Sequence, residues 1–167
     1  SMAILIGVNT AIRDNPSLTV RGRDIGPRDR PVRVVIDPNN RILNDSNLMN
    51  DGLAPTLLVQ ISEFDKTNDK EHVERVVISE NKEIDILKIL DMLGDRKIQS
   101  LLVEGGSNTW MRFLESGFVD KAHLCVSNME LSGESNEIFS KEYLLNSGLT
   151  KIRDIKISND TVSLWKK

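Results

Sequence analysis

The segment Glu104–Thr109, with the sequence EGGSNT, carries residue types that could bind a charged ligand. It closes the almost continuously apolar run Ile98–Glu104 and precedes residues with helical spacing. Glycines let a ligand approach the backbone closely, and the N–H groups that open a helix favour anions. With the hydroxyls of Ser107 and Thr109, this combination would suit a phosphate or pyrophosphate. A tight turn with a helix N-cap has the same composition, so the pattern alone leaves both interpretations open.

A second segment of this kind, Gly7–Arg21, follows the first apolar run of the chain and reads GVNTAIRDNPSLTVR. The guanidinium of Arg21 presents its N–H donors in a fixed planar arrangement that matches a sugar phosphate. Thr10 and Asp14 could contact a ligand, or they could cap a helical turn before Pro16. Arg21 also precedes other arginines within residues 23–30, and such a run is typical of a solvated loop.

Short apolar runs between turn signals predict the elements that position these two segments. They predict strands over residues 3–8, 32–36, 56–61, 75–79, 98–104 and 119–127. Ile86, Leu87, Leu90 and Leu93 recur at helical spacing, and Gly94 with Arg96 and Lys97 predicts the end of that helix. A short helix that contains Trp110, Phe113 and Leu114 follows the glycines and ends at Gly117. Residues 130–141 are polar, which predicts a loop.

The order of these elements predicts an α/β fold with a mostly parallel sheet. The tail alternates over residues 151–158 and 161–165 around Asn159–Asp160, which predicts a C-terminal antiparallel hairpin that adds edge strands to the sheet. The apolar run Ile98–Glu104 predicts a strand covered on both faces by helices. Ligands of such sheets bind beyond the carboxyl ends of the strands, where Gly7–Arg21 and Glu104–Thr109 both lie.

Composition excludes several classes of protein. The 167 residues, 39% of them hydrophobic and 28% charged, indicate a single globular domain. A net charge of −3 does not favour nucleic acid or a membrane surface as partner. The single cysteine, Cys125, excludes an internal disulfide and fits a reducing compartment, so we expect a cytoplasmic protein. His72 and His123 lack companion ligands nearby in the sequence, so no metal site is expected.

Three separated blocks resemble one known family in the same order. They are AILIGVNTAIRDNPSLTVR, RPVRVVID and SLLVEGGSNTWMRFLESGFVDKAHL. They are similar to the C-terminal reductase domain of the bifunctional riboflavin-biosynthesis deaminase/reductase. Its pattern has the form G-x-x-T-x-x-x-D-x-P-x-L-T-V-R, followed later by L-V-E-G-G. The similarity covers residues 3 to about 124 and implies a three-layer, dihydrofolate-reductase-like fold.

The resemblance also implies an activity, a cofactor and partners. The activity would be NADPH-dependent reduction of 5-amino-6-(5-phosphoribosylamino)uracil to its ribitylamino product in riboflavin biosynthesis. Hydride would go to the sugar C1′, with the sugar opened to an imine. The chain would form a homodimer and be fused to, or associated with, a deaminase domain. No metal is implied.

The family's functional residues carry over to matching positions of this chain. The resemblance places Leu18, Arg21 and Glu104 at the substrate. Glu104 would also be catalytic, because its carboxylate could stabilise a cationic iminium as hydride arrives. The residues that would contact the cofactor are Thr10, Asp14, Gly105, Gly106, Ser107, Asn108, Thr109, Trp110, Met111 and Arg112. Trp110 also has a second interpretation, as a core residue.

The chain departs from the family pattern at several places. The family domain begins with a strand of the form K-x-A-x-S-L-D-G, then a segment with serine and tryptophan that contacts both ligands. Neither occurs here, so we expect residues 1–167 to be one reductase-type domain that lacks the first strand of the family fold, as an N-terminally truncated chain would. Pro38 stands where a serine commonly follows VVID, and Ser127–Ser135 replaces a P-K-L-L-G-G segment.

Two other functions fit the same sequence. One is a pteridine or dihydrofolate-type reductase of the same fold. The presence of Arg21 and then Glu104, in this order, favours the riboflavin-pathway reductase over this alternative. The other is a non-catalytic nucleotide-binding or dimerisation remnant, which would bind NADPH without turnover or not bind it.

Overall fold

The computed structural model describes residues 2–20, 26, 30–64, 69–78, 83–127 and 141–167. The chain divides into two compact units, Ser1–Trp110 and Met111–Lys167, with the boundary inside helix α4 (Ser107–Glu115). Each unit contains a sheet of its own, and the first unit carries almost all of the residues predicted to bind ligands.

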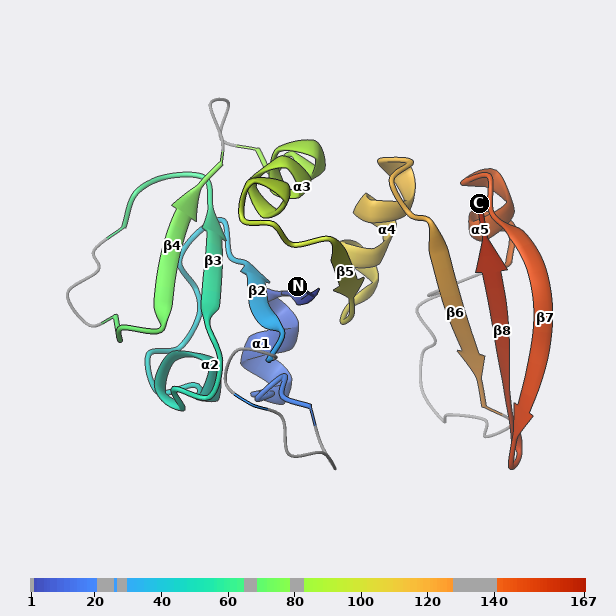
Figure 1. The fold of residues 1–167 in the computed structure, drawn as a ribbon, viewed down its shortest axis with the longest axis horizontal. Helices are drawn as coiled ribbons and strands as arrows, with labels where there is room; N and C mark the ends of the chain where they lie inside the picture. The colour runs from blue at the N-terminus through green and yellow to red at the C-terminus, as the bar shows by residue number, and fades with distance from the viewer. Residues whose placement is uncertain (1, 21–25, 27–29, 65–68, 79–82, 128–140) are drawn as a thin grey trace. The chain divides into compact units, whose positions relative to one another are not determined.

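The sheet of the first unit has five parallel strands in the order β4-β3-β2-β1-β5 (Figure 1). The strands are β1 (Met2–Gly7), β2 (Val32–Ile36), β3 (Thr56–Gln60), β4 (Val73–Val77) and β5 (Ser100–Val103). The predicted strands are therefore confirmed, with β4 starting two residues earlier than expected. Residue 79, where we predicted its end, lies outside the described residues.

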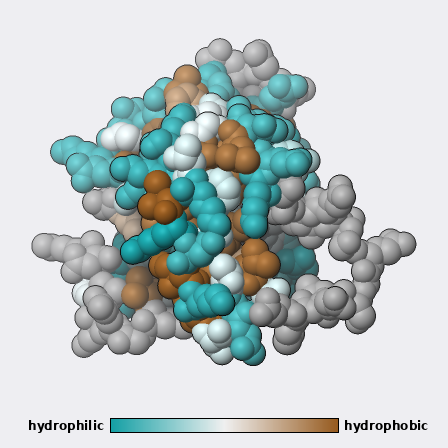
Figure 2. All heavy atoms as spheres, turned by 90° about the vertical axis from the view of Figure 1, so that its right-hand side faces the viewer, coloured by the Kyte–Doolittle hydropathy of each residue, from teal (hydrophilic) through white to brown (hydrophobic). Residues whose placement is uncertain are grey.

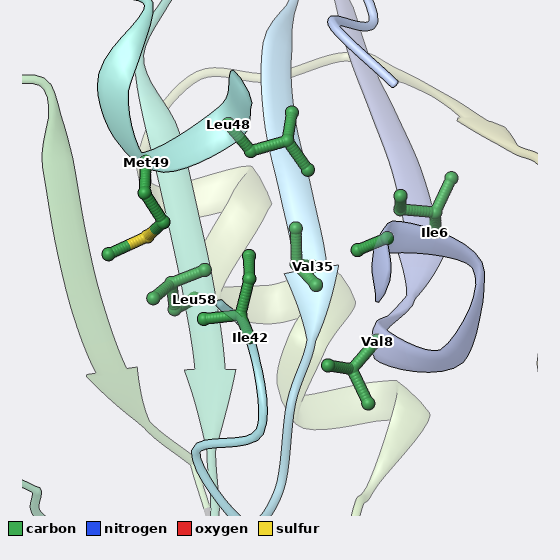
Figure 3. Close-up of a cluster of buried hydrophobic side chains, with 8 residues drawn as sticks. Ile6, Val8, Val35, Ile42, Leu48, Met49 and Leu58 are labelled. Atoms are coloured by element: carbon green, nitrogen blue, oxygen red, sulfur yellow. The ribbon is translucent and has the colours of Figure 1, made fainter. Parts of the chain in front are cut away.

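One face of this sheet is covered by helices α1 (Val8–Asp14) and α2 (Asn47–Asn50). Ile6, Val35 and Leu58 are aligned in register across β1, β2 and β3, so their side chains form one row on that face. The helices add further apolar side chains, and the cluster of buried residues is Ile6, Val8, Ala11, Val35, Ile42, Leu48, Met49 and Leu58 (Figure 3). Burial of each aliphatic side chain stabilises the fold by about 1.5–3 kcal/mol.

The opposite face belongs to α3 (Ile86–Asp95), which Figure 3 shows behind the strands. Leu5, Val34 and Leu57 form the alternate row, which points to that side, and all three are buried. The first unit therefore has three layers, helix on sheet on helix, as predicted.

Helix α3 begins and ends close to the predicted positions. The carboxylate of Asp85 accepts hydrogen bonds from the N–H groups of Leu87 and Lys88, at 2.9 and 3.4 Å, and so caps the helix. The helix ends at Asp95, and the left-handed residue after it is Lys97, with φ of 59°, rather than Gly94. Leu87 is exposed, whereas Ile89 is fully buried.

The prediction that the strand after α3 is covered on both faces is wrong. Among the described strands β5 pairs with β1 alone, and none of its four residues is buried. Leu102 is 44% exposed. An apolar run of this length is typical of a central strand, but hydrophobic pattern alone does not distinguish a central from an edge position.

The second unit contains β6 (Lys121–Val126), α5 (Lys141–Asn146), β7 (Thr150–Ile157) and β8 (Asp160–Lys166). The antiparallel hairpin is confirmed, with its turn at residues 158–159, one residue earlier than predicted. The prediction that it adds edge strands to the parallel sheet is wrong, because among the described strands it pairs with β6 in a separate sheet. In the described residues β8 also pairs with β6, so these strands form a sheet in the order β6-β8-β7. The predicted loop 130–141 lies outside the described residues except for Lys141, which opens α5.

The second unit exposes several large apolar side chains along one strand. Every residue of β7 is exposed, including Ile152, Ile155 and Ile157. Figure 2 shows apolar side chains, in brown, between hydrophilic ones on the face turned to the viewer. No helix among the described residues combines the length and apolar character needed to cross a membrane.

Candidate active site

The candidate site lies at the carboxyl ends of three neighbouring strands. Strand β1 pairs with β2 on one side and with β5 on the other, with Gly7 opposite Ile36 and Leu5 opposite Val103. The segments that leave these strands therefore start next to one another. The structure brings together the two segments that the sequence singled out, although they are far apart in the chain.

A hydrogen bond joins the two segments directly. The N–H of Gly106 donates to the Oγ1 of Thr10 at 3.1 Å. Gly105 has a φ of 106°, and a Cβ added to it would lie 2.9 Å from the same Thr10 oxygen. Glycine is therefore required at position 105 for two reasons, its backbone conformation and the close approach of Thr10.

Thr109 packs against the end of β1. It is 9% exposed, and a Cβ added to Gly7 would lie 2.5 Å from its Oγ1. The hydroxyl of Thr109 thus faces the backbone of Gly7. Ser107 and Asn108, in the first turn of α4, are exposed and can reach a ligand. Farther along this helix, Trp110 and Met111 are half-buried and Arg112 is exposed.

Glu104 lies directly between β5 and the glycines. Its N–H donates to the carbonyl oxygen of Leu5 at 2.8 Å, so β1 fixes its backbone. Its side chain is exposed. The structure therefore presents a carboxylate at the same edge as Thr10 and Gly106, residues to which the family resemblance assigns a contact with the cofactor.

Helix α1 carries Thr10 and Asp14 four residues apart, a spacing that puts both on one face. Neither residue caps the helix, because Gly7 is its N-cap and Asn15 ends it with a φ of 39°. Asp14 accepts a hydrogen bond from the Nε of Arg13 at 2.9 Å. That bond lowers the pKa of Asp14, because it stabilises the ionised carboxylate.

The loop after α1 carries Leu18, the first predicted substrate residue. Leu18 is half-buried against the core cluster and has a φ of 47°, a left-handed conformation that is uncommon for a leucine. Asn47 holds this loop by donating twice to Asn15, from its N–H to Asn15 Oδ1 and from its Nδ2 to the carbonyl oxygen of Asn15, both at 2.8 Å. Arg21, the second predicted substrate residue, lies outside the described residues.

Arg33 also holds this loop, from inside the molecule. Its side chain is fully buried, and Nη1 donates to the carbonyl oxygen of Ser17 at 3.2 Å and to the carboxylate of Asp51 at 2.8 Å. The remaining donors reach Thr56 Oγ1 at 3.0 Å and the carbonyl oxygen of Ala54 at 2.7 Å. The sequence predicted a strand residue here, which is correct, but gave no sign of this network.

The sequence also did not single out the residues at the end of β2. Asp37 is fully buried, and its two carboxylate oxygens accept the N–H groups of Arg41 and Ile42, at 2.8 and 2.9 Å. The guanidinium of Arg41 is exposed and donates to Asn9 Oδ1 at 2.8 Å. Arg41 is a charged residue shortly after β2, and β2 ends beside Gly7. This pattern could have identified Arg41 from the sequence.

These residues offer groups of the kind that bind a phosphorylated ligand. The edge offers exposed glycine backbone at Gly105 and Gly106, polar side chains at Thr10 and Asn108, and a free carboxylate at Glu104. Within the described part of the chain, no three His, Cys, Asp or Glu side chains gather closely enough to hold a metal ion.

Several known proteins are similar to this chain in sequence. The chain is 34% identical over 140 residues to the 2,5-diamino-6-ribosylamino-4(3H)-pyrimidinone 5′-phosphate reductase of Methanothermobacter thermautotrophicus, which covers 78% of this chain and 61% of the relative. It is 32% identical over 169 residues to the riboflavin biosynthesis protein RibD of Aquifex aeolicus, which covers 99% of this chain and 46% of the relative. The chain thus spans about half of these relatives' length.

A solved structure shares the fold. The diaminohydroxyphosphoribosylaminopyrimidine deaminase/5-amino-6-(5-phosphoribosylamino)uracil reductase of Thermotoga maritima matches 98% of this chain with a TM-score of 0.75. The identity is 22%, and the match covers 44% of that protein. The model of the RibD C-terminal domain family matches residues 1–164. The chain belongs to the RibD C-terminal domain family and has its dihydrofolate-reductase-like α/β fold.

Proposed function

We propose that this chain catalyses the NADPH-dependent reduction of 5-amino-6-(5-phosphoribosylamino)uracil to the ribitylamino product in riboflavin biosynthesis. The observation that carries the proposal is the bond between Thr10 and Gly106, which joins the two segments that the family uses for ligands. Glu104 emerges at the same edge. Relatives named as reductases of this pathway support the reaction type.

Bound NADPH would supply the hydride. The protein would position the substrate against the cofactor and stabilise the charge that develops during the transfer. Glu104 would face the substrate, where its carboxylate stabilises the cationic iminium at C1′ as hydride arrives. Its backbone is fixed by Leu5, which limits the reorganisation needed during the reaction. Arg21 would bind the sugar phosphate through its fork of donors, and Leu18 would pack against the substrate.

The cofactor would lie along the start of α4 and the exposed side of α1. Ser107 and Asn108 would donate to its phosphates, together with backbone N–H groups of the glycine segment. Thr10 and Asp14 would contact it from α1, and Trp110, Met111 and Arg112 would extend the contact along α4. Thr109 would act indirectly, since its hydroxyl packs against Gly7.

We propose further that the chain acts as a homodimer in the cytoplasm, with a deaminase domain fused to it or associated with it. Relatives named RibD are longer than this chain, which supports an additional domain. The exposed isoleucines of β7 are apolar surface that a second copy could cover. Light scattering should give twice the 18.8 kDa mass of one chain.

The test measures binding and turnover separately. NADPH is titrated into the 167-residue chain, and into the same chain extended at its N-terminus, and oxidation is followed at the absorbance of the reduced nicotinamide. Substrates are the ribosylaminouracil 5′-phosphate, its 2,5-diaminopyrimidinone counterpart and dihydrofolate. The two pyrimidines are compared because relatives are named for each of them.

We expect oxidation that depends on a ribosylaminopyrimidine phosphate and is not supported by dihydrofolate. Turnover with dihydrofolate instead would favour the pteridine-type alternative. If both forms of the chain bind NADPH without oxidising it, the non-catalytic alternative holds, and if neither binds it, the proposal of a dinucleotide-dependent enzyme fails.

A further inference from the structure

Two residues of the loop after α1 have a left-handed backbone conformation. Asn15 has a φ of 39° and Leu18 a φ of 47°. Asparagine tolerates this region through its short polar side chain, whereas a leucine in it costs free energy and persists only where the surroundings enforce it. Leu18 is also a residue to which the family resemblance assigns a contact with the substrate. The groups that hold this loop therefore bear on how the substrate is bound.

The loop is held at two points. Asn47, at the start of α2, donates from its N–H and from its Nδ2 to Asn15, both at 2.8 Å. Arg33 donates from its Nη1 to the carbonyl oxygen of Ser17 at 3.2 Å. That oxygen belongs to the peptide group that joins Ser17 to Leu18, so the bond fixes the orientation of the backbone that leads into Leu18.

Stability alone does not account for a buried arginine at position 33. Its side chain is fully buried, and that of its partner Asp51 is 15% exposed. Replacing a buried ion pair with apolar residues of similar volume often leaves the stability of a protein unchanged or raises it. An apolar side chain, however, offers no donor to the carbonyl oxygen of Ser17. What the guanidinium adds is therefore a defined conformation of the loop.

We propose that Arg33 and Asn47 are positioning residues for the substrate, because they hold Leu18 in the conformation that packs against it. This inference rests on the proposed function, in which Leu18 contacts the substrate. A loop that is ordered before the substrate arrives loses less conformational entropy on binding, so loss of either residue weakens substrate binding. Neither residue contacts the reacting atoms, and both act through the loop.

The test compares three variants of the 167-residue chain in the reduction of 5-amino-6-(5-phosphoribosylamino)uracil. Arg33→Met/Asp51→Leu removes the donor to Ser17 without leaving a buried charge unpaired. Asn47→Ala removes the Nδ2 bond to Asn15, and because Asn47 is exposed this variant should melt close to the wild-type temperature. Ile89→Ala is the control for stability, since Ile89 is fully buried in α3, on the face of the sheet opposite α1.

We expect the double variant to raise the KM for the pyrimidine by about 10- to 100-fold and Asn47→Ala to raise it by about 3- to 10-fold. The kcat and the NADPH dissociation constant should stay within about twofold of wild type, as loss of uniform substrate binding predicts. Ile89→Ala should melt lower and keep the wild-type KM. Hydrogen exchange of residues 15–20, measured without ligands, should be faster in the double variant and in Asn47→Ala, and unchanged in Ile89→Ala.

An unchanged KM in the double variant would overturn the inference, and an equal rise of the KM in Ile89→Ala would do so too, because the KM would then follow stability. An equal loss of affinity for NADPH would also overturn it, since the network would then support the site as a whole. These results leave the proposed function intact. Asn47→Ala is judged by the same criteria and decides the matter if the double variant does not fold. If the wild type reduces no ribosylaminopyrimidine phosphate, the proposed function fails and the inference fails with it.

Discussion

Glu104 is the residue whose position indicates most clearly what chemistry the candidate site could perform. It is the carboxylate between an apolar strand and two glycines, its N–H is bonded to Leu5, and its side chain is exposed at the edge where α1 begins. A carboxylate held in this way can stabilise positive charge that develops on a bound substrate. It contributes little to the fold, so its role can be tested by substitution.

Glu104→Gln should lower the rate of substrate reduction by roughly 100-fold while leaving the NADPH dissociation constant nearly unchanged, because the amide keeps the shape but not the charge. Stopped-flow single turnover and NADPH titration measure the two effects. Glu71→Gln, at an exposed turn before β4, is the matched control and should behave as wild type. Unchanged turnover in Glu104→Gln would remove Glu104 from the site.

Gly105 offers a steric test of the contact with Thr10. Gly105→Ala should destabilise the chain by about 1–3 kcal/mol, because the added Cβ adopts a strained φ and lies too close to Thr10 Oγ1. It should also weaken NADPH binding. Gly52→Ala is the control, since Gly52 has a positive φ of 62° but nothing within 4 Å of an added Cβ.

Urea unfolding gives the stability change for both glycine variants. A smaller loss of unfolding free energy for Gly105→Ala than for Gly52→Ala would show that Thr10 does not approach position 105 closely. The contact between the two ligand segments would then be wrong.

At the scale of elements, the loop after α1 is held by polar groups that ordinarily favour water. Arg33 is buried in β2 and pairs with Asp51, whose side chain is 15% exposed, and it also bonds to Ser17 in the loop. Burying a charge is costly unless it is paired and hydrogen-bonded, and each of the three guanidinium nitrogens of Arg33 donates to a partner. The network therefore ties the loop that carries Leu18 to the strands β2 and β3.

Arg33→Met should destabilise the chain by about 3–5 kcal/mol, because Asp51 would keep its charge without a partner. The double variant Arg33→Met/Asp51→Leu should recover much of this loss. Arg96→Met, which breaks an exposed pair with Glu74, should cost about 0–1 kcal/mol. Chemical denaturation measures all three, and a loss for Arg33→Met no larger than for Arg96→Met would contradict the buried network.

The elements themselves could be predicted well, because their signals are local. Hydrophobic periodicity predicted β1, β2, β3 and α3 to within a few residues. The edge position of β5 could not be predicted, because it depends on which strands pair and not on the residues of Ile98–Glu104. The short helices α2 and α5 were also missed, since one or two turns leave too short a periodic pattern.

The candidate site was predictable in part for the same reason. Glycines after an apolar run indicated that a ligand or another segment comes close, and the segment turned out to include Thr10. That contact joins residues 96 positions apart, so local sequence could not specify it. The pair of Asn9 and Arg41 is likewise a product of strand order, because it exists only where β1 and β2 are neighbours.

At the scale of the whole molecule, one chain would perform one hydride transfer. The sheet of the first unit brings Thr10, Glu104 and Gly106 to one edge, and family membership supplies the reaction to be tested there. The fold alone does not settle the chemistry, since folds of this kind serve several reactions. The fate of the transferred hydrogen is therefore the most direct evidence.

The decisive measurement uses NADPH that carries deuterium at the transferable position of the nicotinamide, with the 5-amino-6-(5-phosphoribosylamino)uracil substrate and the 167-residue chain. Mass spectrometry and NMR of the product locate the label. We predict a ribitylamino product with deuterium bound to C1′ and none elsewhere. Product without label, label at another carbon, or no product while NADPH is bound would contradict it.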